Sequence, residues 1–378
     1  MFSEIILNEL ETPAICVDKQ KLLRNIRLMQ ELADSNQVAL RPHIKTHKSV
    51  EIAQRQIDIG AIGITVATVD EALVFLKENF KSITIARPII TPSKWDRLLD
   101  GVTKDINPIR VIVDSEEGIR IAAISATRKK QKIGIFLKID VGLHRCGLLP
   151  NDRQLRPLVE MIHTHRYLAF CGILSHSGHV YGSNSLEDAR NVAENERLTM
   201  LDVRDYLRKG GFPVPEVSVG ATPAVLAAKS FEGITEIRPG NYVFLDLLPV
   251  RVGVARLSDI SLTVLATVIS KNDDYFITDA GSKTLTSDTG VHGMIGNHGF
   301  GLAYPIKHFL DAKKQLIVSK VSEEHSMIAR SDYDLSIGSK IRIIPVHSCP
   351  VANLAPEYVI LNSGNFIYWP VDAAGKSK

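Results

Sequence analysis

Short apolar runs rich in β-branched residues alternate with longer amphipathic stretches from Ala14 to about Phe244, and this alternation most constrains the fold. It predicts repeated βαβ units with parallel strands. The nine expected strands are Ala14–Val17, Val38–Arg41, Gly63–Ala67, Ser82–Ala86, Arg110–Val113, Ile133–Ile139, Leu168–Ser175, Glu216–Val219 and Ile234–Arg238. Helical spacing between them is found at Ser49–Ile59, Asp70–Asn79 and Leu186–Lys209, among other segments.

A closed (β/α)8 barrel uses eight strands and about 250 residues, so one expected strand is surplus. We assign the first, Ala14–Val17, to a second domain. After about Leu247 the pattern changes to strands and turns, with strands expected at Ser261–Ser270, Tyr275–Ala280, Gln315–Lys320 and Lys340–Pro345.

The expected fold class is therefore α/β: a (β/α)8 TIM-type barrel with a second, mostly β C-terminal domain. We expect the barrel at residues 18–247 and the β domain at residues 1–17 plus 248–378. The boundary is expected within Leu247–Val254, and the tail Asp372–Lys378 is expected to be disordered.

Composition excludes several classes of protein. The chain has 378 residues with 45% hydrophobic content, enough to bury a large core. A net charge of +3 without a long basic block does not favour nucleic-acid binding. The N-terminus, MFSEIILNELETP, resembles neither a signal peptide nor a membrane anchor, and the four scattered cysteines suggest thiols. We expect a cytoplasmic protein.

The segment RPHIKTHKSV, residues 41–50, carries the first candidate catalytic residue, Lys45. The two-residue period of a strand would place Arg41, His43 and Lys45 on one face, with Lys48 where the next helix begins. An amine held among cations and apolar walls has a lowered pKa, as a Schiff-base lysine requires. The alternative is a basic loop that binds phosphate or faces water.

Enzymes with this barrel build their active sites at the carboxyl ends of the strands. Arg145 follows one expected strand in VGLHRCG, and His176, His179 and Tyr181 follow the next in SHSGHVYG. They are candidate acids, bases or hydrogen-bonding groups. A surface arginine in a turn, and structural roles for the other three, are the alternatives.

Two later strand ends, SVGATPA and EIRPGNY, combine glycine, proline and a hydroxyl or amide side chain. Exposed backbone N–H groups at Gly220, Ala221 and Thr222, and at Gly240 and Asn241, could bind the oxygens of a phosphate group. Such turns are common in loops that bind nothing.

The late motif PVHSCP places His347 and Cys349 after the expected strand Lys340–Pro345, alternating onto one side of an extended backbone. Imidazole with thiolate favours zinc over magnesium or calcium, and two protein ligands leave positions for substrate and water. A buried thiol beside a surface histidine is the alternative.

Taken together, RPHIKTHK, DVGLHRCG, SVGATPA, EIRPGNY and HSCP resemble, in this order, the D-threonine aldolase and D-serine dehydratase group of pyridoxal-phosphate enzymes. That group shares the barrel of the alanine racemases. The resemblance implies that Lys45 carries the cofactor, that Arg145 lies near its ring, and that Thr222, Gly240 and Asn241 hold its phosphate. It further implies that His347 and Cys349 bind a divalent metal, with Tyr181 and His176 as additional catalytic candidates, in a homodimer that takes a small D-amino acid.

Two reactions fit this resemblance. A dehydratase converts a D-3-hydroxy amino acid to a keto acid and ammonia, whereas an aldolase cleaves it to glycine and an aldehyde. Members with cysteine at the second metal position are dehydratases that use zinc, whereas the aldolases tend to carry aspartate there, so Cys349 favours dehydration. D-serine, D-threonine and 3-hydroxyaspartate all stay candidate substrates.

Three further classes stay open. A non-catalytic pyridoxal-phosphate carrier shares the barrel and lysine, but it lacks a second domain. A racemase would need a second acid or base and no metal, so it would tolerate chelation. A metal hydrolase built on His43 and His47 would be colourless, whereas a cofactor bound through Lys45 would make the protein yellow.

Overall fold

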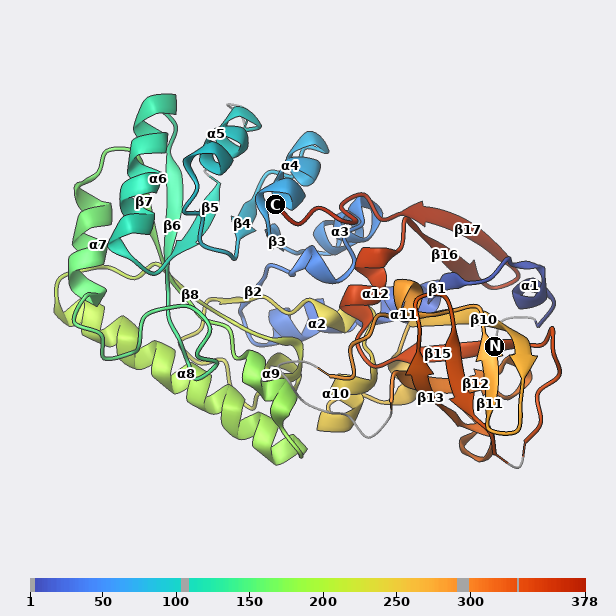
Figure 1. Cartoon of the computed structure of the whole chain (residues 1–378). Coiled ribbons are helices and arrows are strands. Elements are labelled where there is room, and N and C mark those ends of the chain that lie inside the picture. Colours follow the sequence, from blue (N-terminus) through green and yellow to red (C-terminus); the bar gives the residue numbers. More distant parts are fainter. Residues whose placement is uncertain (1–3, 103–108, 291–298, 332) are drawn as a thin grey trace. The chain divides into compact units, whose positions relative to one another are not determined.

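The chain forms two compact units in the computed structural model, which describes residues 4–102, 109–290, 299–331 and 333–378 (Figure 1). The barrel unit comprises Met29–Lys45, Ile52–Gly240 and Lys376–Lys378. The β unit comprises Met1–Leu28, Thr46–Glu51 and Asn241–Gly375. The domain limits expected from the sequence, 18–247 and 1–17 plus 248–378, stay a prediction.

The barrel unit is built on eight parallel strands, as predicted. In spatial order they are β2 (Ala39–Leu40), β9 (Glu236–Ile237), β8 (Glu216–Val219), β7 (Leu168–Leu174), β6 (Ile133–Lys138), β5 (Arg110–Val113), β4 (Ile83–Ile85) and β3 (Ile64–Val66). A parallel bridge between His43 and Thr65 joins the two ends of this order, and the backbone N–H of Thr65 donates to the carbonyl of Pro42 at 2.8 Å. The sheet therefore closes on itself, which confirms the barrel.

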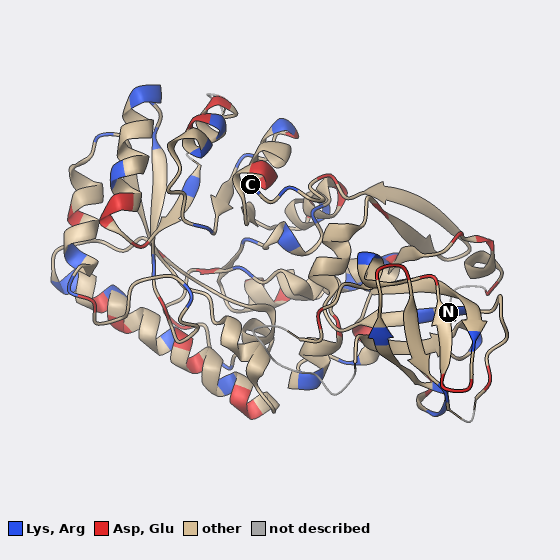
Figure 2. Ribbon diagram, in the orientation of Figure 1, with Lys and Arg blue, Asp and Glu red and all other residues tan. Residues whose placement is uncertain are grey.

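Helices connect these strands. They are α3 (Val50–Asp58), α4 (Val69–Lys77), α5 (Pro92–Asp100), α6 (Glu116–Lys129), α7 (Leu155–Thr164), α8 (Leu186–Lys209) and the short, largely buried α9 (Thr222–Ala227). Thr68, Ser115 and Ser185 cap α4, α6 and α8 by accepting a backbone N–H three residues on, which satisfies a donor that the helix leaves unpaired. Acidic and basic residues alternate along α8 (Figure 2), as expected of a helix with one face in water.

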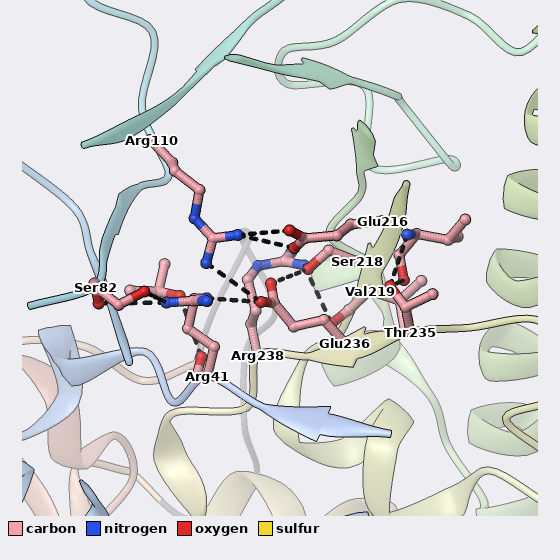
Figure 3. A network of polar contacts seen from close by, with 11 residues as sticks. Arg41, Ser82, Arg110, Glu216, Ser218, Val219, Thr235, Glu236 and Arg238 are labelled. Atoms are coloured by element: carbon pink, nitrogen blue, oxygen red, sulfur yellow. Dashed lines mark hydrogen bonds and ion pairs between the residues drawn. The ribbon is translucent and has the colours of Figure 1, made fainter. Parts of the chain in front are cut away.

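A network of charged and polar side chains lies among the barrel strands (Figure 3). The carboxylate of Glu236 accepts from Nε of Arg41 at 2.6 Å and from the Ser218 hydroxyl at 2.5 Å. Arg110 lies 3.6 Å from the same carboxylate and also donates to Glu216 at 2.8 and 2.9 Å. Because Arg41 and Arg110 each face a carboxylate, these cations can be buried without standing as isolated ions in a medium of low dielectric constant.

The β unit contains a nine-stranded sheet. Its strands, in spatial order, are β11 (Tyr275–Thr278), β14 (Ser326–Ala329), β13 (Leu316–Val321), β12 (Gly301–Pro305), β15 (Lys340–Pro345), β10 (Leu262–Lys271), β1 (Ala14–Asp18), β16 (Glu357–Asn362) and β17 (Asn365–Pro370). β1 pairs antiparallel with β10 and parallel with β16, so the surplus first strand does belong to this sheet.

The sequence patterns did not single out β12, β14, β16 or β17. β17 lies at the sheet edge and leaves most of its residues exposed, so it lacks the alternation that marks a half-buried strand. β14 has only four residues. Strands this short are defined by their partners rather than by their own composition.

The C-terminal tail is ordered, contrary to the prediction. In the β unit, the Asp372 carboxylate accepts from the backbone N–H of Val50 at 2.7 Å, and Ala373 donates to the carbonyl of Lys48 at 3.0 Å. In the barrel unit, the backbone N–H of Asp70 donates to the main-chain oxygen of Lys378 at 3.1 Å. These contacts come from residues remote in sequence, so the composition of the tail could not reveal them. None of the helices among the described residues is long and apolar enough to span a membrane.

Candidate functional site

Lys45 does not lie at a strand end. β2 ends at Leu40, and Lys45 lies in the 3-10 turn Ile44–Thr46. Pro42 has no N–H with which to continue the strand pairing. The backbone still pairs with the adjacent strand ends as far as His43, whose N–H donates to the carbonyl of Pro239 at 2.9 Å. The two-residue alternation of a strand therefore does not extend to Lys45, so its expected place in an extended strand was wrong. Its place on the same face as Arg41 and His43 stays a prediction.

Two imidazoles lie among cations in the barrel unit. Burial, followed by the charge of Lys45 and then of other nearby cationic groups, holds the pKa of both His43 and His176 well below 6.5. Both rings are consequently neutral at pH 7, and Arg145 and Arg238 add further positive charge. The cationic groups all follow the carboxyl ends of barrel strands, where an anionic ligand such as a phosphorylated cofactor would be stabilised.

Lys138, the last residue of β6, belongs to this cationic set and was not among the predicted site residues. It is 3% exposed, and its Nζ donates to the carbonyl of Ile139 at 3.0 Å. Burial, together with Arg238, lowers the pKa of Lys138 from 10.5 to about 8. A lysine inside the otherwise apolar run IGIFLKI is the signal that could have revealed it.

His176 and Tyr181 follow β7, as predicted. Nδ1 of His176 lies 2.9 Å from the carbonyl oxygen of Gly220, and Tyr181 is half-buried in the 3-10 turn Gly178–Gly182. Their catalytic roles stay predictions.

The buried carboxylate of Glu196, on α8, holds the chain on both sides of His176. It accepts from the hydroxyls of Ser175 and Ser177, each at 2.6 Å, and lies 3.4 Å from the backbone nitrogen of Gly220. Glu196 lies within a helix and belongs to no motif, so no sequence pattern singled it out.

The predicted phosphate residues Gly220, Ala221 and Thr222 follow β8, with Thr222 as the first residue of α9, and all three are buried rather than exposed. The hydroxyl of Thr222 accepts from the backbone N–H of Gly240 at 3.2 Å, so these two predicted phosphate residues are hydrogen-bonded to each other. Gly220 has φ +133°, and a Cβ there would lie 3.0 Å from the nitrogen of Arg238. Glycine is thus required by the close approach of two loops.

Asn241 lies in the β unit, and its side chain is committed to protein groups. Its Nδ2 donates to Asp246 Oδ2 at 2.7 Å and to the hydroxyl of Ser348 at 3.0 Å. Both amide hydrogens are thereby used. Any phosphate contact from Asn241 would therefore come from its backbone.

His347 and Cys349 also lie in the β unit, but not along an extended strand. His347 precedes α12 (Ser348–Leu354), with φ −136° and ψ 111°, and Cys349 lies in the first turn of that helix. The expected alternation was wrong because the chain becomes helical at Ser348. The two side chains nevertheless interact: burial lowers the pKa of His347, but Cys349 and Asp288 outweigh it and raise this pKa to about 10.

Neighbours orient both predicted metal ligands. Nδ1 of His347 lies 3.1 Å from Asp288 Oδ2, and the Cys349 thiol donates to the hydroxyl of Thr46 at 3.4 Å. A carboxylate on one ring nitrogen commonly orients a histidine that binds metal through the other. In the described part of the chain, no three His, Cys, Asp or Glu side chains form a metal cluster. The imidazole–thiolate pair fits an ion that keeps open coordination positions.

Comparison with known proteins assigns the family. The alanine racemase N-terminal domain matches residues 17–247, and a serine dehydratase domain matches residues 261–361. The chain is 32% identical to the D-threo-3-hydroxyaspartate dehydratase of Delftia sp. (93% of this chain, 94% of that one). It is 35% identical to the D-serine dehydratase of Dictyostelium discoideum, over 96% of each.

Solved structures agree. That of the Delftia enzyme superposes with a TM-score of 0.89 at 31% identity, covering 97% of this chain and 98% of the other. The same enzyme has been solved as a cysteine-to-alanine mutant in the metal-free form. The D-threonine aldolase of Filomicrobium marinum gives a TM-score of 0.86 at 25% identity, over 98% of each chain. This chain therefore belongs to the alanine racemase-like family that includes the D-serine dehydratases and D-threonine aldolases.

Proposed function

We propose that this protein is a pyridoxal-phosphate- and metal-dependent lyase that removes water from D-3-hydroxy amino acids, a dehydratase of the D-serine type. The observation that carries this proposal is the His347–Cys349 pair, with Asp288 bound to Nδ1 of the histidine. The similarity to two named dehydratases over nearly the whole chain supports it.

The barrel unit offers the residues for the cofactor. Lys45 would hold it covalently, and Arg145 would face its ring. Gly240, Thr222 and the backbone of Asn241 would bind its phosphate. The cations that lower the pKa values of His43 and His176 suit a ligand of negative charge.

His347 and Cys349 would bind the divalent ion, and their donor set favours zinc. Asp288 would keep the proton of His347 on Nδ1 and leave Nε2 for the metal. Thr46 would orient the sulfur of Cys349.

When bound, the cofactor accepts electron density from Cα of the substrate, and the metal acts as a Lewis acid on the β-hydroxyl group. Lys45 Nζ takes the proton from Cα. His176, held neutral, and Tyr181 are candidates to supply or accept further protons. The β-hydroxyl leaves as water, and a second water molecule then replaces the nitrogen of the unsaturated product, which gives a keto acid and ammonia.

We also propose that the protein is a cytoplasmic homodimer. Its ligand is the small D-amino acid substrate, and it binds neither nucleic acid nor a membrane. None of the four cysteines, all of which lie in the described part of the chain, forms a disulfide bond, which is in keeping with a reducing compartment. Sedimentation of the purified protein tests the oligomeric state.

Product analysis tests the function. The purified protein is incubated with D-serine, D-threonine and D-3-hydroxyaspartate, each with zinc present and with a chelator added. Keto acid and ammonia in equal amounts, lost on chelation and restored by zinc, are expected.

Glycine and an aldehyde would instead establish the aldolase reaction, which the similarity to the D-threonine aldolase of Filomicrobium marinum makes the second candidate. Activity that survives chelation and yields the enantiomer of the substrate would overturn the proposal in favour of a racemase.

A further inference from the structure

Asp246, at the start of α10 (Leu247–Val252), has no role in the function proposed above. Its side chain is fully buried, with 0% exposed. The carboxylate is surrounded by four hydrogen-bond donors of the β unit: Asn241 Nδ2 at 2.7 Å, the Ser348 backbone N–H at 2.8 Å, the Ser348 hydroxyl at 3.1 Å and the Leu248 backbone N–H at 3.0 Å.

Three of these four donors reach one oxygen, Oδ2, and two of the three belong to Ser348. Ser348 is the residue between His347 and Cys349. Its backbone N–H is one of those that the first turn of α12 cannot satisfy internally. Asp246 Oδ2 therefore fixes the backbone from which both predicted metal ligands project.

The third donor to Oδ2 belongs to Asn241, one of the residues proposed to hold the cofactor phosphate. Because an ionised carboxylate only accepts hydrogen bonds, Nδ2 rather than Oδ1 of Asn241 must face Asp246. Oδ1 is then buried and has no hydrogen-bond partner among the described residues, so the carboxylate sets an amide orientation that leaves this acceptor unsatisfied there. One oxygen thus holds both Asn241 and the turn that carries His347 and Cys349.

We propose that Asp246 is a positioning residue for the metal-binding pair, and that it holds Asn241 in the same hydrogen-bond network. This inference rests on the proposed function. Asp246 touches neither metal nor substrate in this role: it acts through Ser348. Charge-assisted hydrogen bonds to backbone N–H groups are stronger than neutral ones, which suits a group that must hold a turn in place.

Asp246 also has a structural role as a helix cap. Asp246 Oδ1 also caps α10 by accepting from Leu248, and a residue that served only as a cap would affect stability alone. The variant Asp246→Asn can keep an acceptor oxygen for the cap. Its new NH2 group would then face the N–H of Ser348. Two donors cannot form a hydrogen bond with each other, so the variant selectively disturbs the turn that carries His347 and Cys349.

The test measures the metal site of the cofactor-loaded protein without relying on turnover. Zinc affinity is determined by competition with a chelating dye. Cobalt replaces zinc in parallel, because its long-wavelength absorption bands report the ligand geometry. Asp246→Asn is compared with Asp279→Asn, a matched control in the same unit whose carboxylate accepts from a Thr12 hydroxyl at 2.5 Å and the Thr267 backbone N–H at 2.8 Å.

We expect Asp246→Asn to lower zinc affinity by about 10- to 100-fold, the usual effect of removing a group that orients a ligand. Its cobalt bands should also shift or weaken. Asp279→Asn should match the wild type in both readouts, even if its thermal unfolding midpoint falls equally. If Asp246→Asn does not fold, Ser348→Ala replaces it, because that variant removes one hydrogen bond to Oδ2 and keeps the backbone contact; its zinc affinity should fall less but measurably.

Wild-type zinc affinity and cobalt bands in the folded Asp246→Asn variant, or in Ser348→Ala if only that variant folds, would overturn the inference and leave the proposed function intact. Failure of the wild-type protein to bind zinc, or unchanged zinc affinity in Cys349→Ala, would overturn the metal part of the proposed function, and the role of Asp246 with it.

Discussion

The carboxylate of Asp288 lies 3.1 Å from Nδ1 of His347, although the two residues are far apart in the sequence. Burial lowers the pKa of His347, but Cys349 and this aspartate outweigh it and hold the pKa high, while the histidine lowers the pKa of Asp288. The contact fixes the ring nitrogen that carries the proton.

Asp288→Asn should lower zinc affinity by about 10- to 100-fold, since the amide orients the imidazole less firmly and no longer increases its basicity. Zinc titration against a chelating dye measures this. Asp334→Asn, which breaks the exposed pair with Lys271 in the same unit, serves as control and should bind zinc normally. Equal affinities for the two variants would show that Asp288 does not orient a ligand.

Lys45→Ala should remove the yellow colour and the activity together, because no other residue is proposed to hold the cofactor covalently. Absorption spectra of the purified variant, recorded before and after borohydride, measure the first effect. Lys48→Ala is the control within the same motif. Lys48 bonds to Asn353 at 2.6 Å in the β unit, so its loss should leave the colour in place. A yellow Lys45→Ala protein that bleaches with borohydride would contradict the assignment.

Cys349→Ala should stay yellow but lose metal-dependent turnover by several orders of magnitude, since one imidazole alone binds zinc weakly. Colour, bound zinc and keto-acid production are measured on the same sample. Cys171→Ala, a change at a half-buried thiol of the barrel unit, should leave all three unchanged. Metal-free Cys349→Ala protein that turns over at the wild-type rate would rule out the metal mechanism.

Lys138 should make stability depend on pH. Its pKa is lowered from 10.5 to about 8 in the folded protein, so between these values the unfolded chain holds a proton that the folded chain has lost. Stability from this residue therefore rises as the pH increases from about 8 to 10.5, by at most about 3 kcal/mol, and is unchanged below that range. The difference in thermal unfolding midpoint between wild type and Lys138→Met, measured at several pH values, isolates the effect. A constant difference from pH 7 to 10.5 would contradict it.

Glu236→Gln should destabilise the protein by about 3–5 kcal/mol, because it leaves Arg41 and Arg110 buried beside a neutral group. Thermal unfolding measures the loss. Glu117→Gln removes a fully exposed pair with Arg120 and should change stability little. If Glu236→Gln lowered stability as little as Glu117→Gln, water would have to reach the charged network of the barrel.

Much of the fold could be predicted from the sequence because strand and helix periods are local properties. β5, β8, β15 and α8 have the predicted limits, and β1 joins the second sheet. The site was found less completely. Lys138 could have been recognised as a charge within a strand, whereas Glu196, Asp246 and Asp288 belong to no motif, and their hydrogen-bond partners come from other parts of the chain.

The sequence by itself determined the barrel, the second β domain and the candidate residues Lys45, His347 and Cys349, because apolar periodicity and side-chain chemistry are encoded residue by residue. Only the tertiary structure decided how those residues are held. It placed Lys45 in a turn beyond β2 and His347 and Cys349 at a helix start. The physical reason is that burial removes water as a partner, so each polar group must find a donor or acceptor wherever the folded chain supplies one.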